Sequence, residues 1–332
     1  MNPLHVLRRL ANLALVLLAM TFMIFALQQA SPGDPARAAL GATASQEAVA
    51  AERSALGLDK PLPVRFALYL GRLARGDLGQ STHTHNPVTE DIGHFLPASL
   101  ELMTAGLALG AILGVAVALA PILAPRLAVL RWALIGVASA PIFLTGLLLS
   151  LVFWRQLGWL PGGGQVTPDR YVDGPTGLMA LDGLLTGHPA MTLDALAHLV
   201  LPALTLALPA AVAIGRTLDS SLNQTMRQDY IRTARSKGLG EGAILRRHAL
   251  RNAAGPPLSM FGLQVALMFG NLVVVEQIFS WPGIGLYLSQ AFSASDLPAV
   301  LGVALVFAST YLLLTALIEA AQAWLDPRIA AS

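Results

Sequence analysis

The sequence predicts an all-α membrane protein with six transmembrane helices and a small external helical segment after the first helix. Of its 332 residues, 55% are hydrophobic and only 12% are charged, which is about half the charged share of a soluble domain. The hydrophobic residues gather in blocks of the ~20 residues that a bilayer-spanning helix needs. These blocks lack the period-two alternation of a membrane β-strand, so the chain is expected to be helical.

Six apolar blocks, each rich in Ala, Leu, Val and Gly, follow one another along the chain. They are Leu10–Ala30, Pro97–Ala120, Leu127–Trp154, Ala195–Leu222, Pro257–Phe279 and Pro298–Leu325. Arg8 and Arg9 precede the first block, as in a signal peptide. Its apolar run is longer than a typical h-region, and no clear small-x-small cleavage site follows it. We therefore expect the first block to remain as a transmembrane helix.

The basic residues predict that both ends of the chain lie in the cytoplasm. The segment from Asn223 to Pro256 holds seven Lys and Arg residues, the loop from Arg155 to Asp194 holds two, and the loop from Ser280 to Leu297 holds none. Short loops rich in Lys and Arg stay in the cytoplasm. Residues 1–30 are then a cytoplasmic tail with the first helix, residues 31–96 lie outside, and residues 326–332 form a second cytoplasmic tail.

The external segment, residues 31–96, is too long for a turn and too mixed in composition for disorder. Two of its stretches, ASQEAVAAERSALGL and PVRFALYLGRLARG, have the apolar spacing of short helices. The segment is therefore expected to form a small helical subdomain.

The basic segment contains the stretch DYIRTARSKGLGEGAILRRHALRNAAGP, residues 229–256. Met226, Tyr230 and Ala234 recur every four residues, as along one helical stripe. Lys237 followed by Gly238 is typical of a helix end, with a cation in the last turn and a glycine beyond it. A second short helix is expected from about residue 240 to about residue 250.

The second short helix of the basic segment mixes its faces. On a helical wheel Leu239, Ala243 and Leu250 fall on one side, while Ile244 falls on the other side among arginines. A helix lying on lipid separates its apolar and charged faces. The mixed faces favour a helix that docks in a protein groove, and a charged loop that serves only as an orientation signal remains the alternative.

The same stretch closely resembles the EAA-type loop of the ABC-transporter permeases that import dipeptides, oligopeptides and nickel, the inner-membrane components of binding-protein-dependent transport systems. The general motif has Glu-Ala-Ala and then, after three further residues, Gly. The matching positions here are Arg232, Thr233, Ala234 and Gly238, so Arg and Thr replace the first two motif residues. The motif's later Ile-x-Leu-Pro is also altered, with His248, Leu250 and Arg251 at the named positions.

Four further stretches are similar to the same family and stand in the expected order. They are SPGDPARAALG, LGLDKPLPVRFALYLGRLARGDLGQS, VVVEQIFSWPGIGLYLSQAFSASDLPAVLG and WLDPRI. The resemblance implies the six-helix arrangement of an ABC type I importer permease, with residues 97–325 as its core and residues 222–256 as its cytoplasmic coupling loop.

The resemblance also implies function and partners. The chain would be half of a peptide pathway in a bacterial inner membrane, paired with a homologous second permease, two cytoplasmic ABC ATPase subunits or domains, and an extracytoplasmic binding protein. By the same resemblance, Gly238 would form the turn of the coupling loop, and the loop's docking contacts would be Glu241, Ile244, Leu245 and His248. The external segment either contacts the binding protein or only caps the helices. A nickel or metal-chelate importer is the alternative, and a membrane scaffold or sensor is the alternative of a different class.

Several enzyme classes are excluded. The chain's two lysines, Lys60 and Lys237, follow Asp59 and Ser236, so no Gly-Lys of a P-loop occurs and any ATP would bind to partner subunits. Neither His-Glu-x-x-His nor Gly-x-Ser-x-Gly is present. The absence of cysteine excludes thiolate metal sites and cysteine nucleophiles. We expect a transport subunit that is no enzyme, holds no cofactor, and contacts membrane lipid but no nucleic acid.

The histidines are weak candidates for a site. His83 and His85, with His94 further along the chain, could bind a metal in the external segment. A solvated loop is the favoured interpretation, because His83 and His85 have no third ligand at a fixed spacing. His198 is expected to be a packed residue of its helix rather than part of a protease site.

Polar residues within the apolar blocks are candidates for the transport pathway. Gln264 and Asn271 stand seven residues apart and share one helix face, where they line a pathway or bond to a neighbouring helix. Glu276, Pro282 and Gly283 belong to EQIFSWPGIG, which is expected to be an outer gate or a packing corner. Two further glutamates, Glu101 and Glu319, stand near helix ends and are expected to reach water.

Overall fold

The computed structural model describes residues 14–23, 25–26, 45–55, 59–123, 136 and 140–325. These residues form helices and turns, with an isolated antiparallel bridge between Gln80 and Pro87. The chain divides into two compact units, residues 1–96 with 287–312 and residues 97–286 with 313–332. The fold class is therefore helical, as predicted.

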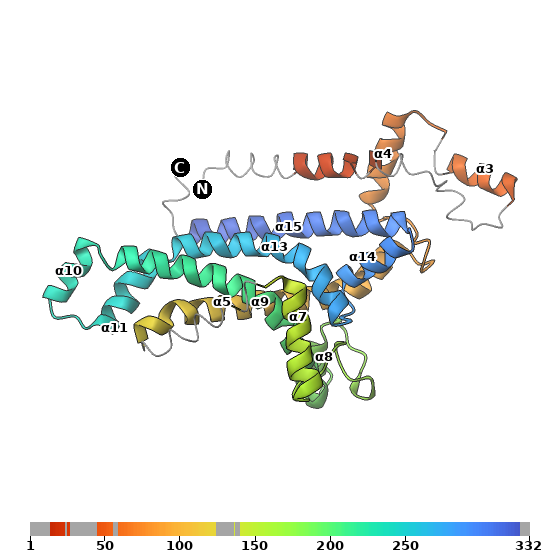
Figure 1. Ribbon diagram of the computed structural model, residues 1–332. Helices are drawn as coiled ribbons and strands as arrows, with labels where there is room; N and C mark the ends of the chain where they lie inside the picture. Colours follow the sequence, from red (N-terminus) through yellow and green to blue (C-terminus); the bar gives the residue numbers. More distant parts are fainter. Residues whose placement is uncertain are drawn as a thin grey trace. The chain divides into compact units, whose positions relative to one another are not determined.

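In the first unit, two short helices occupy the predicted external segment (Figure 1). Helix α3 spans Gln46–Ala55 and helix α4 spans Leu62–Leu73, which confirms both predicted helices. Pro63 stands in the first turn of α4, where the missing N–H of proline costs nothing. The Tyr69 ring of α4 packs against Phe25, with the ring centroids 5.6 Å apart.

The same unit contains a tight turn at residues 80–87, which is stabilised by hydrogen bonds to two acidic side chains. Asp91 accepts hydrogen bonds from the Thr84 hydroxyl at 2.5 Å and from the Tyr287 hydroxyl at 2.8 Å. Asp296 accepts hydrogen bonds from the Ser81 hydroxyl and from the N–H of the next helix. Burial and the hydrogen bond to Asp91 raise the pKa of Tyr287.

The second unit is a bundle around one long helix, α9 (Figure 1). Helix α9 spans Pro189–Thr225, and helices α7, α8, α12 and α13 pack against it. The bounds of the other elements are Ile142–Leu149 for α7, Ser150–Gln156 for the π-helical turn η2 that continues it, Pro168–Arg170 for the 3₁₀ turn η3, Met179–Leu185 for α8, Asp229–Ser236 for α10, Glu241–Ile244 for α11, Leu245–Ala249 for the π-helical turn η4, Leu250–Ala253 for α12 and Gly255–Ile278 for α13. Three helices cross the boundary between the units: α5 (Val88–Leu123), α14 (Ile284–Ser293) and α15 (Leu297–Leu325).

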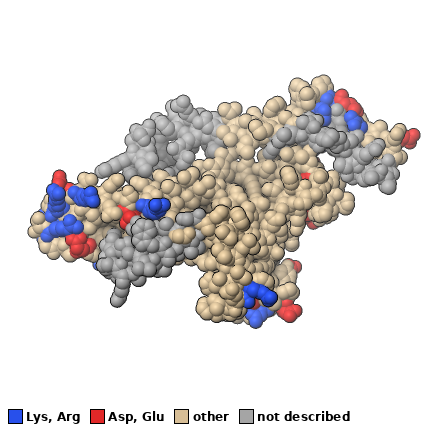
Figure 2. Space-filling view, in the orientation of Figure 1, with Lys and Arg blue, Asp and Glu red and all other residues tan. Residues whose placement is uncertain are grey.

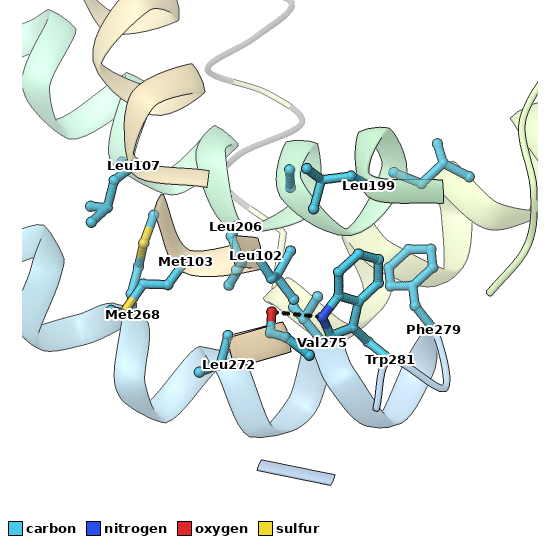
Figure 3. Packing of buried hydrophobic residues seen from close by; sticks show 14 of the residues in the cluster. Leu102, Met103, Leu107, Leu199, Leu206, Met268, Leu272, Val275, Phe279 and Trp281 are labelled. Atoms are coloured by element: carbon cyan, nitrogen blue, oxygen red, sulfur yellow. Dashed lines mark hydrogen bonds between the residues drawn. The ribbon is translucent and has the colours of Figure 1, made fainter. Parts of the chain in front are cut away.

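The main hydrophobic core lies where α5, α9 and α13 meet (Figure 3). Leu102, Leu206 and Leu272 are buried there, and Phe279 and Trp281 close the core at one end. The indole N–H of Trp281 donates to the Ala98 carbonyl at 2.9 Å, so the largest ring of the core carries no unpaired polar group.

Small residues bring α5 and α9 close together. Gly106, Gly110 and Gly114 stand four residues apart and so form one stripe of α5. A Cβ added at Gly110 would lie 3.2 Å from the Ala207 carbonyl oxygen, and one at Gly114 would lie 3.1 Å from the Ala211 carbonyl oxygen. Glycine therefore lets the two backbones approach closely, as in the small-residue motifs of membrane helices.

Four described helices are long and apolar enough to cross a membrane: Val88–Ala120, Pro189–Thr225, Gly255–Ile278 and Leu297–Leu317. Shorter apolar helices cover Ala14–Met23 and Ile142–Gln156, inside the first block and at the end of the third. The remainder of the third predicted helix, up to residue 139 apart from residue 136, lies outside the described residues. The structure thus supports four of the predicted spans in full, and the count of six remains a prediction.

Several of these helices extend beyond their apolar blocks. Helix α5 begins at Val88 rather than at Pro97, and α9 begins at Pro189 rather than at Ala195. The first turn of α5 holds Glu90 and Asp91, which the positive end of the helix dipole stabilises. Hydropathy detects only the apolar part of a helix, so it placed these starts too late.

Candidate functional site

The basic segment folds into a helical hairpin, which we call the basic hairpin, residues 229–253. Helix α10 ends at Ser236, and Gly238 follows with φ at +81°, the left-handed conformation that favours glycine. The Gly238 N–H donates to the Arg235 carbonyl at 2.9 Å, and the Leu239 N–H donates to the Ala234 carbonyl at 3.3 Å. These two bonds make a Schellman motif. The predicted helix end at Lys237 and Gly238 is therefore confirmed.

The apolar side chains of the basic hairpin pack within this chain. Ile231, Ala234 and Ile244 form one buried cluster between the two arms. On the other side of the second arm, Leu245 and Ala249 pack into a second buried cluster that also contains Ala118, Leu218, Leu222 and Ala253. The hairpin is thus a packed part of the unit rather than a free loop.

The predicted docking contacts Ile244 and Leu245 are buried in this structure, and their docking role stays a prediction. Ile244 is 0% exposed and Leu245 is 7% exposed, so neither side chain is free to contact a partner in this conformation. These contacts were carried over from the family resemblance, and in this structure the two side chains instead complete the clusters within the chain.

The predicted stripe of the first arm is also wrong. Helix α9 ends at Thr225 and α10 begins at Asp229, so Met226 lies in the turn between two helices. Tyr230 is exposed, and the buried face of α10 consists of Ile231 and Ala234.

The charged side chains of the basic hairpin point outward. Figure 2 shows Lys and Arg gathered over α10 and α11. The predicted site residues Arg232, Thr233 and Glu241 are exposed, whereas His248 is half-buried. The hairpin therefore presents a surface that is mainly basic and is backed by apolar packing.

One ion pair links the two arms of the basic hairpin. Arg235 Nε donates to Glu241 Oε1 at 2.6 Å, and a second guanidinium nitrogen donates to Glu241 Oε2 at 3.1 Å. This hydrogen bonding lowers the pKa of Glu241 and raises that of Arg235. The pair spans the turn at Gly238 with the bidentate geometry that arginine and a carboxylate favour.

Two further glycines leave the tip of the basic hairpin uncovered. A Cβ added at Gly240 or at Gly242 would meet no atom within 4 Å, and neither residue has a positive φ. The fold of this chain therefore does not require glycine at either position. Exposed backbone without side chains allows another protein surface to approach closely.

The corner between α13 and α14 buries Glu276 completely. Glu276 Oε1 accepts the Ser99 hydroxyl at 2.5 Å, and Oε2 accepts the Leu286 N–H at 2.9 Å. The Ser99 oxygen in turn accepts the Ile284 N–H at 2.8 Å. The carboxylate and the hydroxyl thus satisfy the free N–H groups at the start of α14, as capping residues do.

Glycines make room for this carboxylate. A Cβ at Gly283 would overlap the Glu276 carboxylate, and one at Gly285 would lie 2.8 Å from the Val273 Cα. Pro282 is half-buried beside them. Of the two interpretations of EQIFSWPGIG, these contacts favour the packing corner over the gate.

The other pathway candidates lie on α13. Gln264 is buried, with its Nε2 3.7 Å from the Met260 sulfur, and Asn271 is half-buried. These positions do not distinguish a pathway from a contact with a neighbouring helix, so the role of both residues stays a prediction.

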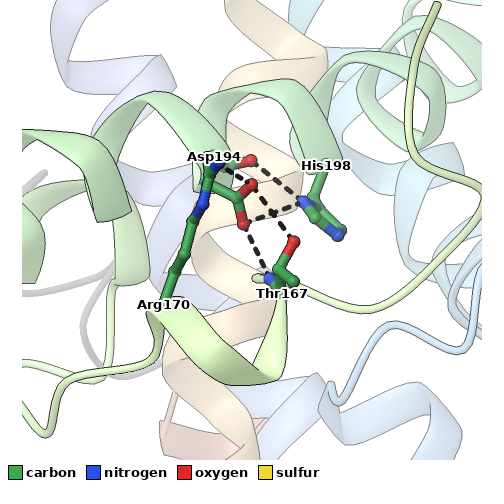
Figure 4. A network of polar contacts seen from close by, with 4 residues as sticks. All are labelled: Thr167, Arg170, Asp194 and His198. Carbon is green, nitrogen blue, oxygen red and sulfur yellow. Dashed lines mark hydrogen bonds and ion pairs between the residues drawn. The ribbon is translucent and has the colours of Figure 1, made fainter.

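Two carboxylates, Asp194 and Glu101, bind the segment before α9, and the sequence analysis did not single out Asp194. Asp194 accepts hydrogen bonds from the Thr167 N–H at 2.7 Å and from Arg170 at 3.1 Å, and His198 Nδ1 lies 2.9 Å from the Asp194 carbonyl (Figure 4). His198 is therefore a packed helix residue, as expected. Glu101 was expected to reach water, but it accepts the Ala180 N–H at 3.0 Å and the Gln165 amide at 3.1 Å.

The histidines of the 80–87 turn do not gather into a metal site. Among the described residues, no group of three or more His, Asp and Glu side chains is placed to hold a metal ion. Ser81 and Thr84 order the turn through Asp296 and Asp91 instead.

Two kinds of structural residue escaped the sequence analysis. The glycine stripe of α5 could have been found in the sequence, because Gly106, Gly110 and Gly114 recur every four residues. Ser99 has none, because its partner Glu276 lies 177 residues further along the chain.

Comparisons with known proteins agree with this architecture. The family model of the binding-protein-dependent transport system inner membrane component matches residues 107–331, and the model of its N-terminal region matches residues 4–103. The dipeptide transport system permease protein of Alkalihalophilus pseudofirmus is 36% identical over 329 residues, 98% of each chain. The probable D,D-dipeptide transport system permease protein of Escherichia coli is 37% identical, over 97% of this chain and 96% of its own. The glutathione transport system permease protein of Salmonella typhi is 32% identical, over 98% of each chain.

Proposed function

The chain belongs to the inner-membrane components of binding-protein-dependent transport systems, and from this membership we propose that it is the permease subunit of an ATP-driven peptide importer. It forms half of the pathway and pairs with a homologous second permease. Two ATPase subunits or domains bind on the cytoplasmic side, and an extracytoplasmic binding protein delivers the peptide. The chain moves its substrate without a chemical reaction of its own.

The relatives support peptides as the substrate class. The three reported above are named for dipeptides or for glutathione, which is itself a small peptide, and none is named for nickel. The histidines of the 80–87 turn also lack the grouping that a metal importer could use among the described residues. A nickel or metal-chelate substrate is therefore not favoured.

The observation that carries the coupling role is the construction of the basic hairpin. Its apolar side chains pack against other residues of this chain. Its cations face outward, and so does its backbone at Gly240 and Gly242. A rigid, exposed tip of this kind transmits force from a docked ATPase to α9 and α13. Closure of the ATPases on nucleotide then shifts the helices between outward-open and inward-open populations.

The exposed tip allows a test that leaves the fold of this chain intact. Gly242→Asp places a carboxylate where a Cβ meets no atom within 4 Å and in the first turn of α11, where a negative charge suits the helix dipole. We expect the Gly242→Asp permease to purify from membranes without its ATPase subunits, and the wild type to purify with them.

The matched control is Gly71→Asp. Gly71 lies in α4, and a Cβ there also meets no atom within 4 Å. The control should retain the ATPases. If Gly242→Asp retains them too, the tip is not the docking surface. If the wild type carries no ATPase, the importer assignment fails and a scaffold or sensor is supported.

The substrate class has a separate test. The assembled transporter in proteoliposomes, supplied with its binding protein and ATP, should take up a labelled dipeptide and leave ⁶³Ni²⁺ outside. Uptake of nickel without uptake of peptide would overturn the substrate proposal and leave the coupling proposal intact.

The membrane orientation follows from the same proposal, with both termini and the basic hairpin in the cytoplasm. Because the chain has no cysteine, Lys237→Cys introduces a single thiol at the exposed hairpin. A membrane-impermeant maleimide should leave this thiol unlabelled in intact spheroplasts and label it in inverted membrane vesicles. The opposite pattern would reverse the orientation.

A further inference from the structure

The segment between η2 and α9, residues 157–188, turns its large apolar side chains outward. Trp159 is 69% exposed, Leu184 is 62% exposed and Leu185 is 58% exposed. The last two belong to α8, whose sequence MALDGLL has Asp182 as its single charged residue. A short helix on a water-exposed surface would instead turn its leucines inward.

The polar groups around α8 are turned inward. Asp182 is completely buried and accepts the Thr176 N–H at 3.0 Å and the Gly177 N–H at 2.8 Å. Glu101 accepts the Ala180 N–H in the first turn of α8. The segment therefore satisfies its buried polar groups within the protein, as a structure in an environment of little water must.

Helix α8 is fixed on the first turn of α9. A Cβ at Gly183 would lie 2.7 Å from the Thr192 nitrogen, and the Thr192 hydroxyl donates to the Ala180 carbonyl at 3.1 Å. Its seven residues measure about 10 Å, too short to cross the ~30 Å hydrocarbon layer. The helix therefore lies beside the end of a spanning helix.

The apolar surface of α8 continues along α9 without a charge. Leu193, Leu196 and Val200 are exposed at helical spacing on α9, and Asp194 and His198 of the same turns are turned inward. On the face in view, Figure 2 shows the charges around α7 and α8 gathered at the tip of this part.

Side-chain size favours lipid over a second protein as the cover of this surface. Where α9 meets the α5 glycines Gly110 and Gly114 it uses small residues, Ala207 and Ala211, and its larger packed side chains, such as Leu206, face the core of this chain. Membrane helices use small residues where they pack and large ones toward lipid. Trp154, also exposed, and Trp159 add the aromatic side chains that gather at the level of the headgroups.

We propose that α8, together with Trp159 and the first turns of α9, lies in the membrane interface and contacts lipid at the boundary of acyl chains and headgroups. Helix α8 and Trp159 are then seated in the membrane interface, whereas the exposed charged stretch around Asp169 faces water. The inward carboxylates Glu101, Asp182 and Asp194 hold this element in the shape that lipid contact requires. The proposal does not depend on the identity of the transported substrate.

The absence of native cysteine allows a direct test in the assembled transporter. Leu184→Cys and Leu185→Cys each receive a nitroxide label in bilayer discs of phosphatidylethanolamine and phosphatidylglycerol. Collisions with oxygen, which concentrates in lipid, should exceed collisions with a water-soluble nickel chelate at both positions. The control Asp169→Cys, at an exposed charged position of the same segment, should show the reverse ratio.

Two outcomes would overturn the proposal. A ratio at both leucine positions equal to that at Asp169→Cys would place α8 in water. Protection of both labels from oxygen and from the nickel chelate would show that a protein partner covers the surface. Neither outcome would affect the peptide-import proposal, which is tested by uptake.

Discussion

The basic hairpin and the Glu276 corner both depend on a glutamate and on nearby glycines, but they use them in opposite ways. Glu241 is exposed and pairs with Arg235 across the hairpin turn. Glu276 is completely buried and accepts a hydroxyl and a backbone N–H. Gly240 and Gly242 face open space, whereas Gly283 lies against a carboxylate.

The difference separates surface that is available to a partner from surface that the fold has already used. Exposed ion pairs contribute little to stability, so the hairpin can change its partners at small cost. Buried polar groups cost much when a partner is removed. We therefore expect the Glu276 corner to keep its contacts during transport. The basic hairpin is expected to change its contacts with the partner.

The largest effect is expected at the buried glutamate. Glu276→Leu leaves the Ser99 hydroxyl and the Leu286 N–H without their acceptor, at about 1–3 kcal/mol for each buried donor. We expect a clear fall in the Tm of the purified transporter. The Tm is measured as the temperature at which the size-exclusion peak of the transporter is lost. Glu241→Leu is the matched control and should leave the Tm near that of wild type. Equal Tm values for the two variants would contradict the distinction between the corner and the hairpin.

A second pair of variants compares two glycines. Gly283→Ala forces a methyl group against the Glu276 carboxylate, and such overpacking costs about 1–3 kcal/mol. Gly240→Ala adds the same methyl group in open space and should leave the Tm almost unchanged. The same melting measurement tests both variants, and a smaller loss at Gly283 than at Gly240 would show that the corner can relax.

A third variant tests whether Ile244 belongs to the fold of the hairpin. Ile244→Ala removes a fully buried side chain from the cluster with Ile231 and Ala234, a change that typically costs 2–5 kcal/mol. Hydrogen exchange should become faster in α10 and α11 while α13 keeps its protection. Unchanged exchange together with loss of the ATPases would instead support Ile244 as a direct docking contact.

The smallest effect concerns the ion pair between the hairpin arms. Because Arg235 lowers the pKa of Glu241, the pair adds stability above the unfolded-state pKa of the carboxyl and loses it as the pH falls through the lowered folded-state value. Hydrogen exchange in α11, corrected for its intrinsic pH dependence, should show a small loss of protection in the acid range. Arg235→Gln should remove that loss, and its persistence would assign it to another group.

Local chemistry predicted the elements of the hairpin well. Lys237 and Gly238 mark a helix end by their own residue types, and the structure ends α10 there. The apolar blocks likewise predicted α9, α13 and α15 to within a few residues, except at the start of α9. These features depend on interactions between residues that are near in sequence.

The burial of individual side chains was predicted poorly. The family resemblance implied that Ile244 and Leu245 face a partner, but they pack into the clusters with Ile231 and Leu222. Helix α5 was expected to begin at Pro97, and its polar first turns extend it back to Val88. In both cases the deciding contacts came from other elements or from polar turns that hydropathy does not detect.

The sequence by itself determined that the chain is a helical membrane protein with a basic hairpin between two long apolar helices, because hydropathy, charge and turn glycines act locally. The permease function was implied by the resemblance of its motifs to a known family. Only the tertiary structure decided which polar residues are free. Glu276 meets Ser99 across 177 residues, and Glu101 meets Gln165 across 64. The cost of a buried, unpaired polar group selects such partners, and it acts through space rather than along the chain.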